Sequence, residues 1–120
     1  MSLVPTAPPS NISYSHVTPN SSVIGWTHIP YLNRHGVPSS FILNASGILA
    51  NGTLHSLGPF NVSAHPDTPE FDFMIDNLFP KTIYNVTLIG CTRIGCGPPT
   101  GITFETLEMG KYFVFAFNNL

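Results

Sequence analysis

The 120-residue sequence contains very few charged residues, and their scarcity limits the kinds of partner that the protein can bind. Asp, Glu, Lys and Arg make up 8 % of the chain, against about 25 % in ordinary soluble domains. Only four residues are Lys or Arg, and the formal net charge is -2. Because a nucleic-acid-binding surface is built from many clustered Lys and Arg side chains, this composition excludes nucleic acid as a partner.

Cysteine is also scarce, since the chain has only Cys91 and Cys96. A chain of this length buries about two-thirds of its unfolded surface, so it can fold as one domain without cross-links. Zinc sites usually join one closely spaced cysteine pair to a second spaced pair of ligands, and the five histidines supply no such pair. We therefore expect no metal and no cofactor. The alternative is a metal site that combines the two thiols with one or more of the histidines.

The N-terminus, MSLVPTAPPS, lacks the basic and apolar regions of a secretory signal peptide. We interpret residues 1–3 as an added start and the chain as a segment of a larger protein. The tail, residues 108–120, contains six consecutive apolar residues from Tyr112 to Phe117, too few for a membrane span of about 20. An exposed apolar segment of this kind tends to pair as a β-strand. We interpret the tail as a linker or as an extra strand that adds to a sheet edge, with self-association as one outcome.

Asparagine, by contrast, occurs in an unusual pattern. Six of the ten asparagines begin an Asn-X-Ser/Thr sequence, where chance alone predicts about two. The excess indicates a secreted or cell-surface protein carrying N-linked glycans, although loops rich in Ser and Thr also generate unused sequons. The candidate sites are Asn11, Asn20, Asn44, Asn51, Asn61 and Asn85.

Short runs of β-branched and aromatic residues alternate with proline, glycine and asparagine, and no helical periodicity is sustained. This pattern predicts an all-β fold, a seven-stranded antiparallel β-sandwich. Asn51-Gly52 predicts a type I′ turn between the third and fourth strands, and the proline-containing residues 56–70 predict a long exposed loop. The expected strands are residues 11–17, 22–27, 40–49, 53–56, 71–75, 84–92 and 101–106.

The sequons also predict which face of each strand is buried, because a glycan-bearing asparagine must face water. With Asn11, Asn44 and Asn85 outward, the inward residues are Ile12 and Tyr14 in the first strand, Phe41, Leu43 and Ala45 in the third, and Tyr84, Val86, Leu88 and Gly90 in the sixth. Each inward set is the apolar set, so the sequons and the hydrophobic pattern agree.

The same alternation places Cys91 on the outer face at the end of the sixth strand, not in the core. A hairpin closed by the sequence TRIG brings Cys96 opposite Cys91, within the distance range of a disulfide. We therefore predict a disulfide that stiffens this loop. Arg93 and Ile94 lie at its tip, and we expect them to be contact residues, since rigid loops are common binding sites.

Three stretches, PPSNISYS, SSVIGW and NLFPKTIYNVTLIGCTRIGCGPPT, together resemble a fibronectin type III domain over residues 4–107. The most specific part is the Leu-x-Pro-x-x-x-Tyr run of Leu78, Pro80 and Tyr84. The resemblance implies that the Tyr84 hydroxyl bonds a nearby backbone group and that Trp26 is the core tryptophan of the second strand. The paired cysteines resemble those of usherin-like proteins and certain receptor tyrosine phosphatases.

The resemblance implies a non-catalytic extracellular module of an adhesion or receptor protein, which acts as a spacer and a protein contact surface beside neighbouring domains. Its protein partners are unknown, and the parent is either secreted or a single-pass membrane protein. One alternative is a receptor ectodomain whose enzymatic domain lies elsewhere, and another is an intracellular structural sandwich. A third is an enzyme, for which the candidate residues are Asp72, Asp76, His55 and His65, although no nucleophile elbow or metal-ligand cluster accompanies them.

Overall fold

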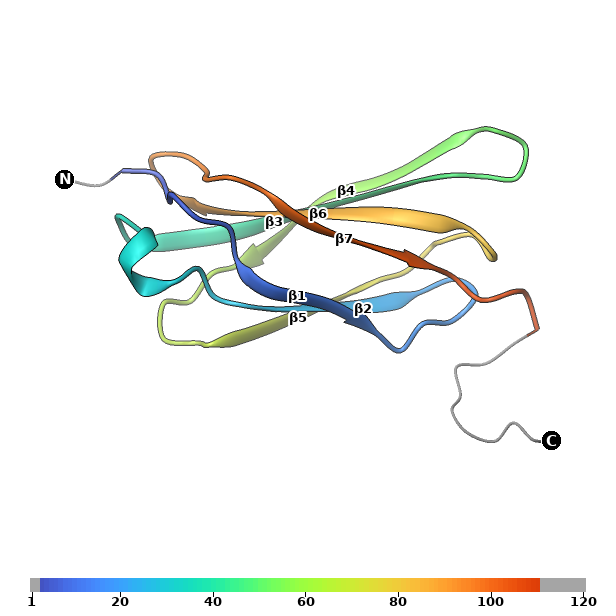
Figure 1. The fold of residues 1–120 in the computed structure, drawn as a ribbon, viewed down its shortest axis with the longest axis horizontal. Coiled ribbons are helices and arrows are strands. Elements are labelled where there is room, and N and C mark those ends of the chain that lie inside the picture. Colours follow the sequence, from blue (N-terminus) through green and yellow to red (C-terminus); the bar gives the residue numbers. More distant parts are fainter. Residues whose placement is uncertain (1–2, 111–120) are drawn as a thin grey trace.

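The protein is a β-sandwich of seven strands in a computed structural model that describes residues 3–110 (Figure 1). One short 3-10 helix, η1 (Tyr31–Asn33), lies between the second and third strands. The strands are β1 (Ser10–Ser15), β2 (Ser22–Thr27), β3 (Pro38–Ile48), β4 (Leu54–Ser63), β5 (Glu70–Ile75), β6 (Ile83–Thr92) and β7 (Thr100–Glu105).

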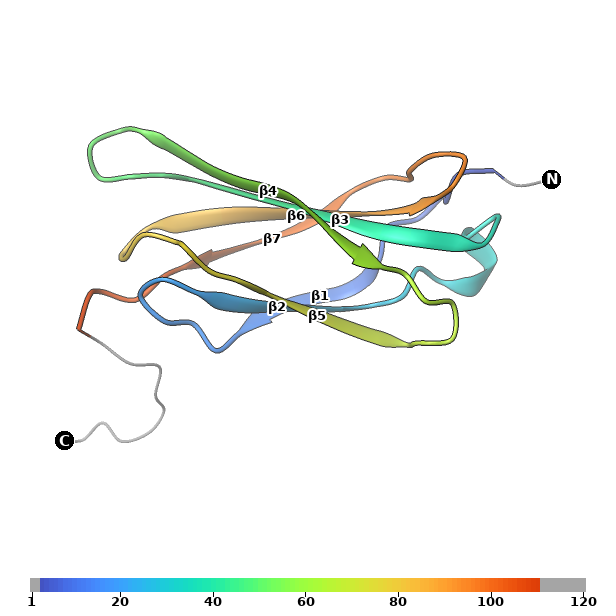
Figure 2. The same ribbon diagram turned by 180° about the vertical axis from the view of Figure 1, so that it is seen from behind.

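The strands form two antiparallel sheets that face each other (Figure 2). One sheet has the order β1-β2-β5, and the other has the order β4-β3-β6-β7. The chain therefore crosses between the sheets after β2, after β4 and after β5. This arrangement confirms the predicted seven-stranded antiparallel sandwich. The interpretation of residues 1–2 and the predicted strand within residues 112–117 concern positions outside the described residues.

The expected fourth strand, residues 53–56, was too short, and the predicted loop over residues 56–70 was wrong. The strand β4 continues to Ser63, so that only residues 64–69 connect it to β5. Pro59 lies inside β4 after a cis peptide bond with Gly58, and the β3–β4 register shifts between Leu43 and Ala45. Since β4 is an edge strand, a residue without a backbone N–H is tolerated there.

The turn between β3 and β4 lies where Asn51-Gly52 predicted it, but it is not of type I′. A type I′ turn needs positive φ at both central residues, and only Gly52 has one, at +86°. The Gly52 N–H instead donates to the Leu49 carbonyl at 2.8 Å, which places Gly52 at the last position of the turn. The side chain of Asn51 accepts a hydrogen bond from the Thr53 N–H at 2.9 Å.

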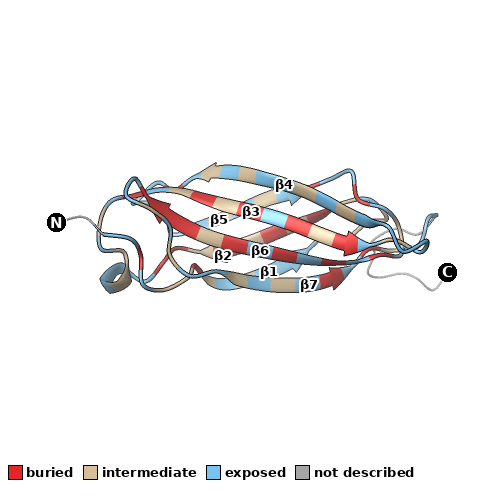
Figure 3. Ribbon diagram, turned by 90° about the horizontal axis from the view of Figure 1, so that it is seen from above, coloured by how far each residue is buried: buried red, intermediate tan, exposed pale blue. Residues whose placement is uncertain are grey.

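The core lies between the two sheets and follows the alternation of the central strands (Figure 3). Trp26 is 2 % exposed, and its ring meets Phe41 edge-on with a centroid separation of 5.5 Å. Leu78 is also buried, whereas Pro80 is half-buried. The predicted inward residues of β3 and β6 are all buried, namely Phe41, Leu43, Ala45, Tyr84, Val86, Leu88 and Gly90.

The first strand departs from the predicted alternation. Tyr14 is 46 % exposed, although its ring still contacts the ring of Phe104 at a centroid separation of 5.6 Å. The β1–β2 register shifts between Ser10 and Ser13, and Asn11 has a φ of +53°. Because β1 is an edge strand with a bulge, its inward side chains lie at the rim of the sandwich and are only partly covered.

Tyr84 makes the backbone bond that the resemblance implied. Its side chain is fully buried, and its hydroxyl oxygen accepts the Phe79 N–H at 2.9 Å. The same hydroxyl lies 2.8 Å from Nδ1 of His55 on β4. The sequence offered no signal for this second partner, because the contact depends on His55 of β4 and Tyr84 of β6 both lying opposite Gly47 of β3.

Candidate functional site: the loop pole

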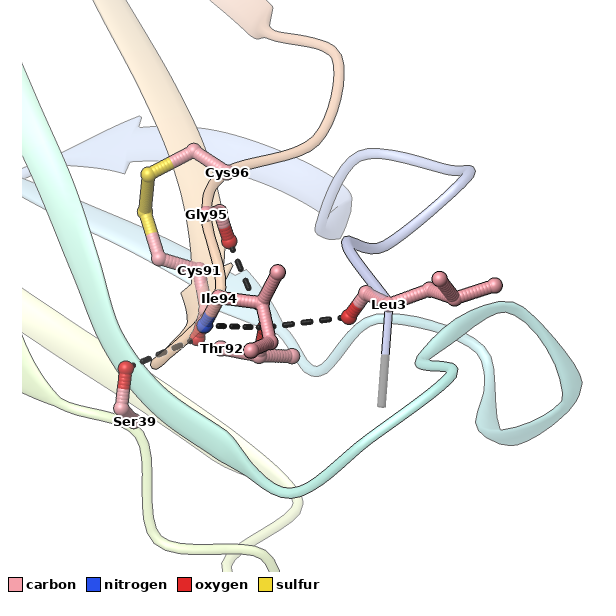
Figure 4. The surroundings of a disulfide bond; sticks show 7 residues. All are labelled: Leu3, Ser39, Cys91, Thr92, Ile94, Gly95 and Cys96. Atoms are coloured by element: carbon pink, nitrogen blue, oxygen red, sulfur yellow. Dashed lines mark hydrogen bonds between the residues drawn. A yellow bond between two sulfur atoms is a disulfide. The ribbon is translucent and has the colours of Figure 1, made fainter. Parts of the chain in front are cut away.

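The β6–β7 loop is closed by a disulfide between Cys91 and Cys96 (Figure 4). The two Cα atoms are 4.0 Å apart, and the residues pair as an isolated antiparallel bridge. The Thr92 N–H donates to the Gly95 carbonyl at 2.9 Å, so the tip of the loop is a tight turn. Backbone hydrogen bonds and the disulfide therefore both hold this loop in one shape. Both thiols are used in the bond, which removes the alternative metal site built on them.

Cys91 is buried at 4 % exposure, so the expectation that it would not be a buried thiol was wrong. Strand alternation predicts the face of a side chain, but it does not predict what covers that face. The last three residues of β6, Gly90, Cys91 and Thr92, are all buried. The loop returns over them, where the Gly97 N–H donates to the Gly90 carbonyl at 3.0 Å. Cys96, in contrast, is exposed.

Leu3 joins this loop to the β2–β3 connection. Its N–H donates to the His35 carbonyl at 2.7 Å, and its own carbonyl accepts the Thr92 hydroxyl at 3.0 Å (Figure 4). The N-terminal segment also approaches Gly97 closely, since a Cβ placed there would lie 2.6 Å from the Pro5 carbonyl oxygen. These contacts hold three segments, far apart in sequence, side by side at one end of the sandwich.

Arg34 supports the β2–β3 connection from within. Its Nε donates to the Ile29 carbonyl at 2.9 Å, and its Nη1 donates to the Pro66 carbonyl at 3.4 Å. Its guanidinium also lies over the ring of Tyr31, 5.5 Å from the centroid. This arginine therefore ties the β2–β3 and β4–β5 connections together, and its hydrogen-bonding capacity is partly used inside the protein.

We call the exposed surface built by these segments the loop pole, and it is strongly apolar. Its apolar residues are Leu3, Tyr31, Leu32, Val37 and Ile94, with exposures of 50 %, 78 %, 84 %, 71 % and 56 %. The predicted contact residues Arg93 and Ile94 both lie there and are both exposed. Among the described residues, Arg93 has no ion-pair partner, so its charge is available to another molecule.

Two open hollows connect the parts of the loop pole. One, of about 380 Å³, lies between Val37, Pro38, Thr92 and Arg93. The other, of about 540 Å³, lies on the far side of Val37 and Pro38 and is bordered by Tyr31 and Leu32. Because Val37 and Pro38 border both hollows, the surface is continuous from the β6–β7 loop to η1. Apolar side chains around open hollows, with a cation at the rim, are typical of protein contact surfaces.

The six sequon asparagines are all exposed. Three of them lie on the outer face of the four-stranded sheet, because Asn44 pairs with Thr87, Asn85 with Ser46, and Asn61 with Ile42. Asn51 lies in the turn at the end of that sheet, while Asn11 and Asn20 lie in β1 and the β1–β2 turn. No sequon lies on the β2–β3 connection or on the β6–β7 loop.

The four residues considered for catalysis are not brought together. Asp72 lies on the outer face of β5 beside Gly25, Asp76 follows that strand, and His65 lies in the β4–β5 connection. His55 is bonded to Tyr84, and no hydrogen bond joins any two of the four. Within residues 3–110, no three His, Cys, Asp or Glu residues are grouped so that they could hold a metal ion. That same part of the chain has no helix long and apolar enough to cross a membrane.

Comparison with known proteins defines the class of the fold. No family model matches the chain, and no curated protein sequence matches it. Solved structures do match. The third fibronectin III domain of human KIAA0343 protein is similar at a TM-score of 0.70 and 16 % identity, over 90 % of this chain and 87 % of that one. The FN1–FN3 domains of chicken CNTN1 are similar at 0.63 and 18 % identity, over 87 % of this chain and 32 % of that one.

A titin fragment is also similar, at a TM-score of 0.65 and 22 % identity, over 88 % of this chain and 33 % of that one. The two sheets and these neighbours show that the chain has the fibronectin type III fold, which confirms the predicted fold. Domains of this fold are generally non-catalytic structural modules. The narrower resemblance to usherin-like proteins and receptor phosphatases stays a prediction.

Proposed function

We propose that the protein is a non-catalytic extracellular module of an adhesion or receptor protein, and that it makes its protein contacts through the loop pole. The proposal is carried by one observation, an exposed apolar surface whose two main loops hold no sequon, whereas the exposed Ile48, Leu54 and Ile83 lie on the sheet face beside Asn85. The outer face of the four-stranded sheet holds Asn44, Asn61 and Asn85, and glycans there would shield it. The loop pole has no sequon on its two main loops and has five exposed apolar side chains.

The fold and the disulfide support an extracellular location, since disulfides persist in oxidising compartments. The test is to produce the chain through a secretory route and to measure its mass before and after enzymatic deglycosylation. We expect a loss of mass that corresponds to glycans on Asn44 and Asn85 at least, and no titratable thiol in the unreduced protein. An unglycosylated product with two free thiols would favour the intracellular structural sandwich instead.

The contact role is tested by attachment of cells to a surface coated with the glycosylated protein. We expect Ile94→Asp, which places a charge in the apolar patch, to lower attachment at least tenfold, a change of about 1.4 kcal/mol. The matched control is Ile83→Asp, because Ile83 has the same 56 % exposure but lies on the opposite end of the four-stranded sheet. Equal losses from both variants would contradict a contact role for the loop pole. Absence of attachment to any cell type would leave only the spacer role.

A further inference from the structure

The strand β5 forms one edge of the three-stranded sheet, and its pairing is regular throughout. Within residues 3–110, β5 pairs only with β2, in an unbroken register from Ser22 opposite Ile75 to Thr27 opposite Glu70. In an antiparallel pair, every second residue of a strand directs its backbone N–H and C=O groups away from its neighbour. The outer edge of β5 therefore presents a continuous row of donors and acceptors.

The other three edge strands of the sandwich are interrupted or covered. Proteins commonly protect sheet edges with bulges, prolines or neighbouring segments. The β1–β2 register shifts between Ser10 and Ser13, and β4 contains Pro59. The strand β7 lies beside β1, where the rings of Tyr14 and Phe104 are 5.6 Å apart. Among the described strands, β5 is thus the edge best suited to accept an added strand.

The inner face of β5 is only partly covered. Phe71 and Phe73 pack against the core, yet both are only half-buried, as is Phe60 on β4. The rings of Phe60 and Phe73 lie 5.0 Å apart, which shows that they meet across the opening between the two sheets (Figure 2). Phe71 continues this row inward, with its ring 4.8 Å from that of Phe41. Apolar side chains on an added strand would remove this aromatic row from water.

The outer face of β5 is acidic. Glu70 and Asp72 alternate with the two phenylalanines, and both carboxylates are exposed. Neither forms an ion pair with another residue of 3–110. Asp72 lies opposite Gly25, which lies opposite Ser13, and an open hollow of about 520 Å³ covers this row. Because Gly25 has no side chain, a long basic side chain has room to lie across the sheet beside Asp72.

The same carboxylates oppose the pairing of β5 with a second copy of itself. Two antiparallel registers keep the phenylalanines on one face and overlap most of the strand. One places Asp72 of one copy opposite Asp72 of the other, and the second places Glu70 opposite Asp76. Like charges directly opposite each other destabilise a sheet. The carboxylates therefore favour an added strand that carries cations.

We propose that the edge of β5 binds an extended segment of another protein, in which basic residues alternate with apolar residues. When the segment adds antiparallel to β5, its Lys or Arg side chains lie opposite Asp72 and Glu70. Its apolar side chains then lie opposite Phe71 and Phe73. In this mode of recognition, main-chain hydrogen bonds supply affinity and alternate side chains supply specificity. The inference does not rest on the proposed function, because no residue of the loop pole belongs to β5.

The test uses the full chain and a hexapeptide with blocked ends, Thr-Phe-Lys-Phe-Lys-Thr. The matched control is Thr-Phe-Glu-Phe-Glu-Thr, which has the same pattern and the opposite charge. Calorimetry measures binding, and deuterium exchange locates the bound peptide. We expect the lysine peptide to bind at least tenfold more tightly than the glutamate peptide. It should slow exchange at residues 70–75 and leave exchange at residues 10–15 unchanged.

Reversing the charge of the edge should reverse this preference. We expect the variant that combines Glu70→Lys with Asp72→Lys to bind the glutamate peptide more tightly than the lysine peptide. The matched control combines Glu105→Lys with Glu108→Lys, because it changes the net charge equally at exposed residues outside β5. This control should keep the preference of the parent. The same peptide preference in both variants would contradict recognition by Glu70 and Asp72.

Other results would overturn the proposal at the level of the edge itself. Equal binding of the two peptides, or no binding of either, would show that β5 does not select a basic strand. Protection of all the amides of residues 70–75 in the free monomer would mean that another part of the same chain covers the edge. Protection that increases with protein concentration would assign the edge to a second copy of the chain.

Discussion

The hydroxyl group of Tyr84 lies 2.8 Å from Nδ1 of His55, and it also accepts the backbone N–H of Phe79 at 2.9 Å. One buried oxygen thus connects β6, the β5–β6 connection and the edge strand β4. The ring of His55 packs edge-on against the ring of Phe79, with a centroid separation of 4.7 Å. This arrangement fixes the end of the sandwich opposite the loop pole.

We expect Tyr84→Phe to lower the free energy of unfolding by about 1–3 kcal/mol, because the variant removes a hydroxyl from a fully buried side chain and leaves the part-buried Phe79 N–H without its acceptor. Chemical denaturation of the two proteins measures the difference. Tyr14→Phe is the matched control, since that tyrosine is 46 % exposed, and its stability should change by less than about 0.5 kcal/mol. An unchanged denaturation curve for Tyr84→Phe would contradict the structural role of the hydroxyl. A double-mutant cycle with His55→Ala should give a coupling of about 0.5–3 kcal/mol.

Trp26→Ala should destabilise the domain by about 3–5 kcal/mol. Trp26 is 2 % exposed, and its ring lies against those of Phe41 and Phe71, so its loss leaves a cavity at the centre of the core. The measurement is again denaturation, with Tyr31→Ala as the control, because Tyr31 is 78 % exposed. Similar losses from both variants would show that the core is not centred on Trp26.

Replacing both cysteines, as Cys91→Ala with Cys96→Ala, should cost about 2 kcal/mol, because the disulfide closes a ring of about six residues. The fold should remain, since the hydrogen bonds from Thr92 and Gly97 still hold the loop. Denaturation measures the change in stability, and deuterium exchange should show faster exchange confined to residues 92–97. Peptide mapping of the secreted protein provides a second check. Finding either thiol free, or bonded between chains, would contradict the prediction that a disulfide stiffens the β6–β7 loop.

Stability should decrease on acidification because of His28. Burial, and then the nearby Arg34 guanidinium, lower the pKa of His28 below its usual 6.5, while a backbone group of His65 opposes the shift in part. Between the lowered folded pKa and about 6.5, the unfolded chain binds more protons than the folded chain. The contribution of His28 to the free energy of unfolding is therefore fully present above about pH 6.5, and it is lost as the pH falls through this range.

The check is to measure the free energy of unfolding against pH in the parent and in His28→Asn. The asparagine side chain carries no titrating group, and its oxygen can accept the Ile29 N–H that Nδ1 of His28 accepts at 2.8 Å. We expect the difference between the two proteins to be constant above about pH 6.5 and to shrink as the pH falls. A difference that does not vary with pH would rule out His28 as a source of acid sensitivity.

Local patterns in the sequence were sufficient for the fold class and for most strand positions. The strand β2 has the predicted bounds, and five others, β1, β3, β5, β6 and β7, differ by one or two residues. Period-two alternation is a local property, so the inward residues of β3 and β6 followed directly from it. The pairing of Cys91 with Cys96 was also local, because four residues in a hairpin separate the two.

Features that depend on distant segments required the tertiary structure. The local sequence around Pro59 predicts a loop, but an edge strand tolerates a proline. Only the order of the strands in the sheet shows that β4 is an edge strand. Alternation along β6 places Cys91 on the outer face, but Cys91 is buried because the β6–β7 loop returns over the end of the strand. Likewise, the loop pole brings residues 3, 37 and 94 together because Leu3 is hydrogen-bonded to His35 and to Thr92, in the segments that hold the other two. Burial and surface composition are set by what lies across space, which alternation along one strand does not encode.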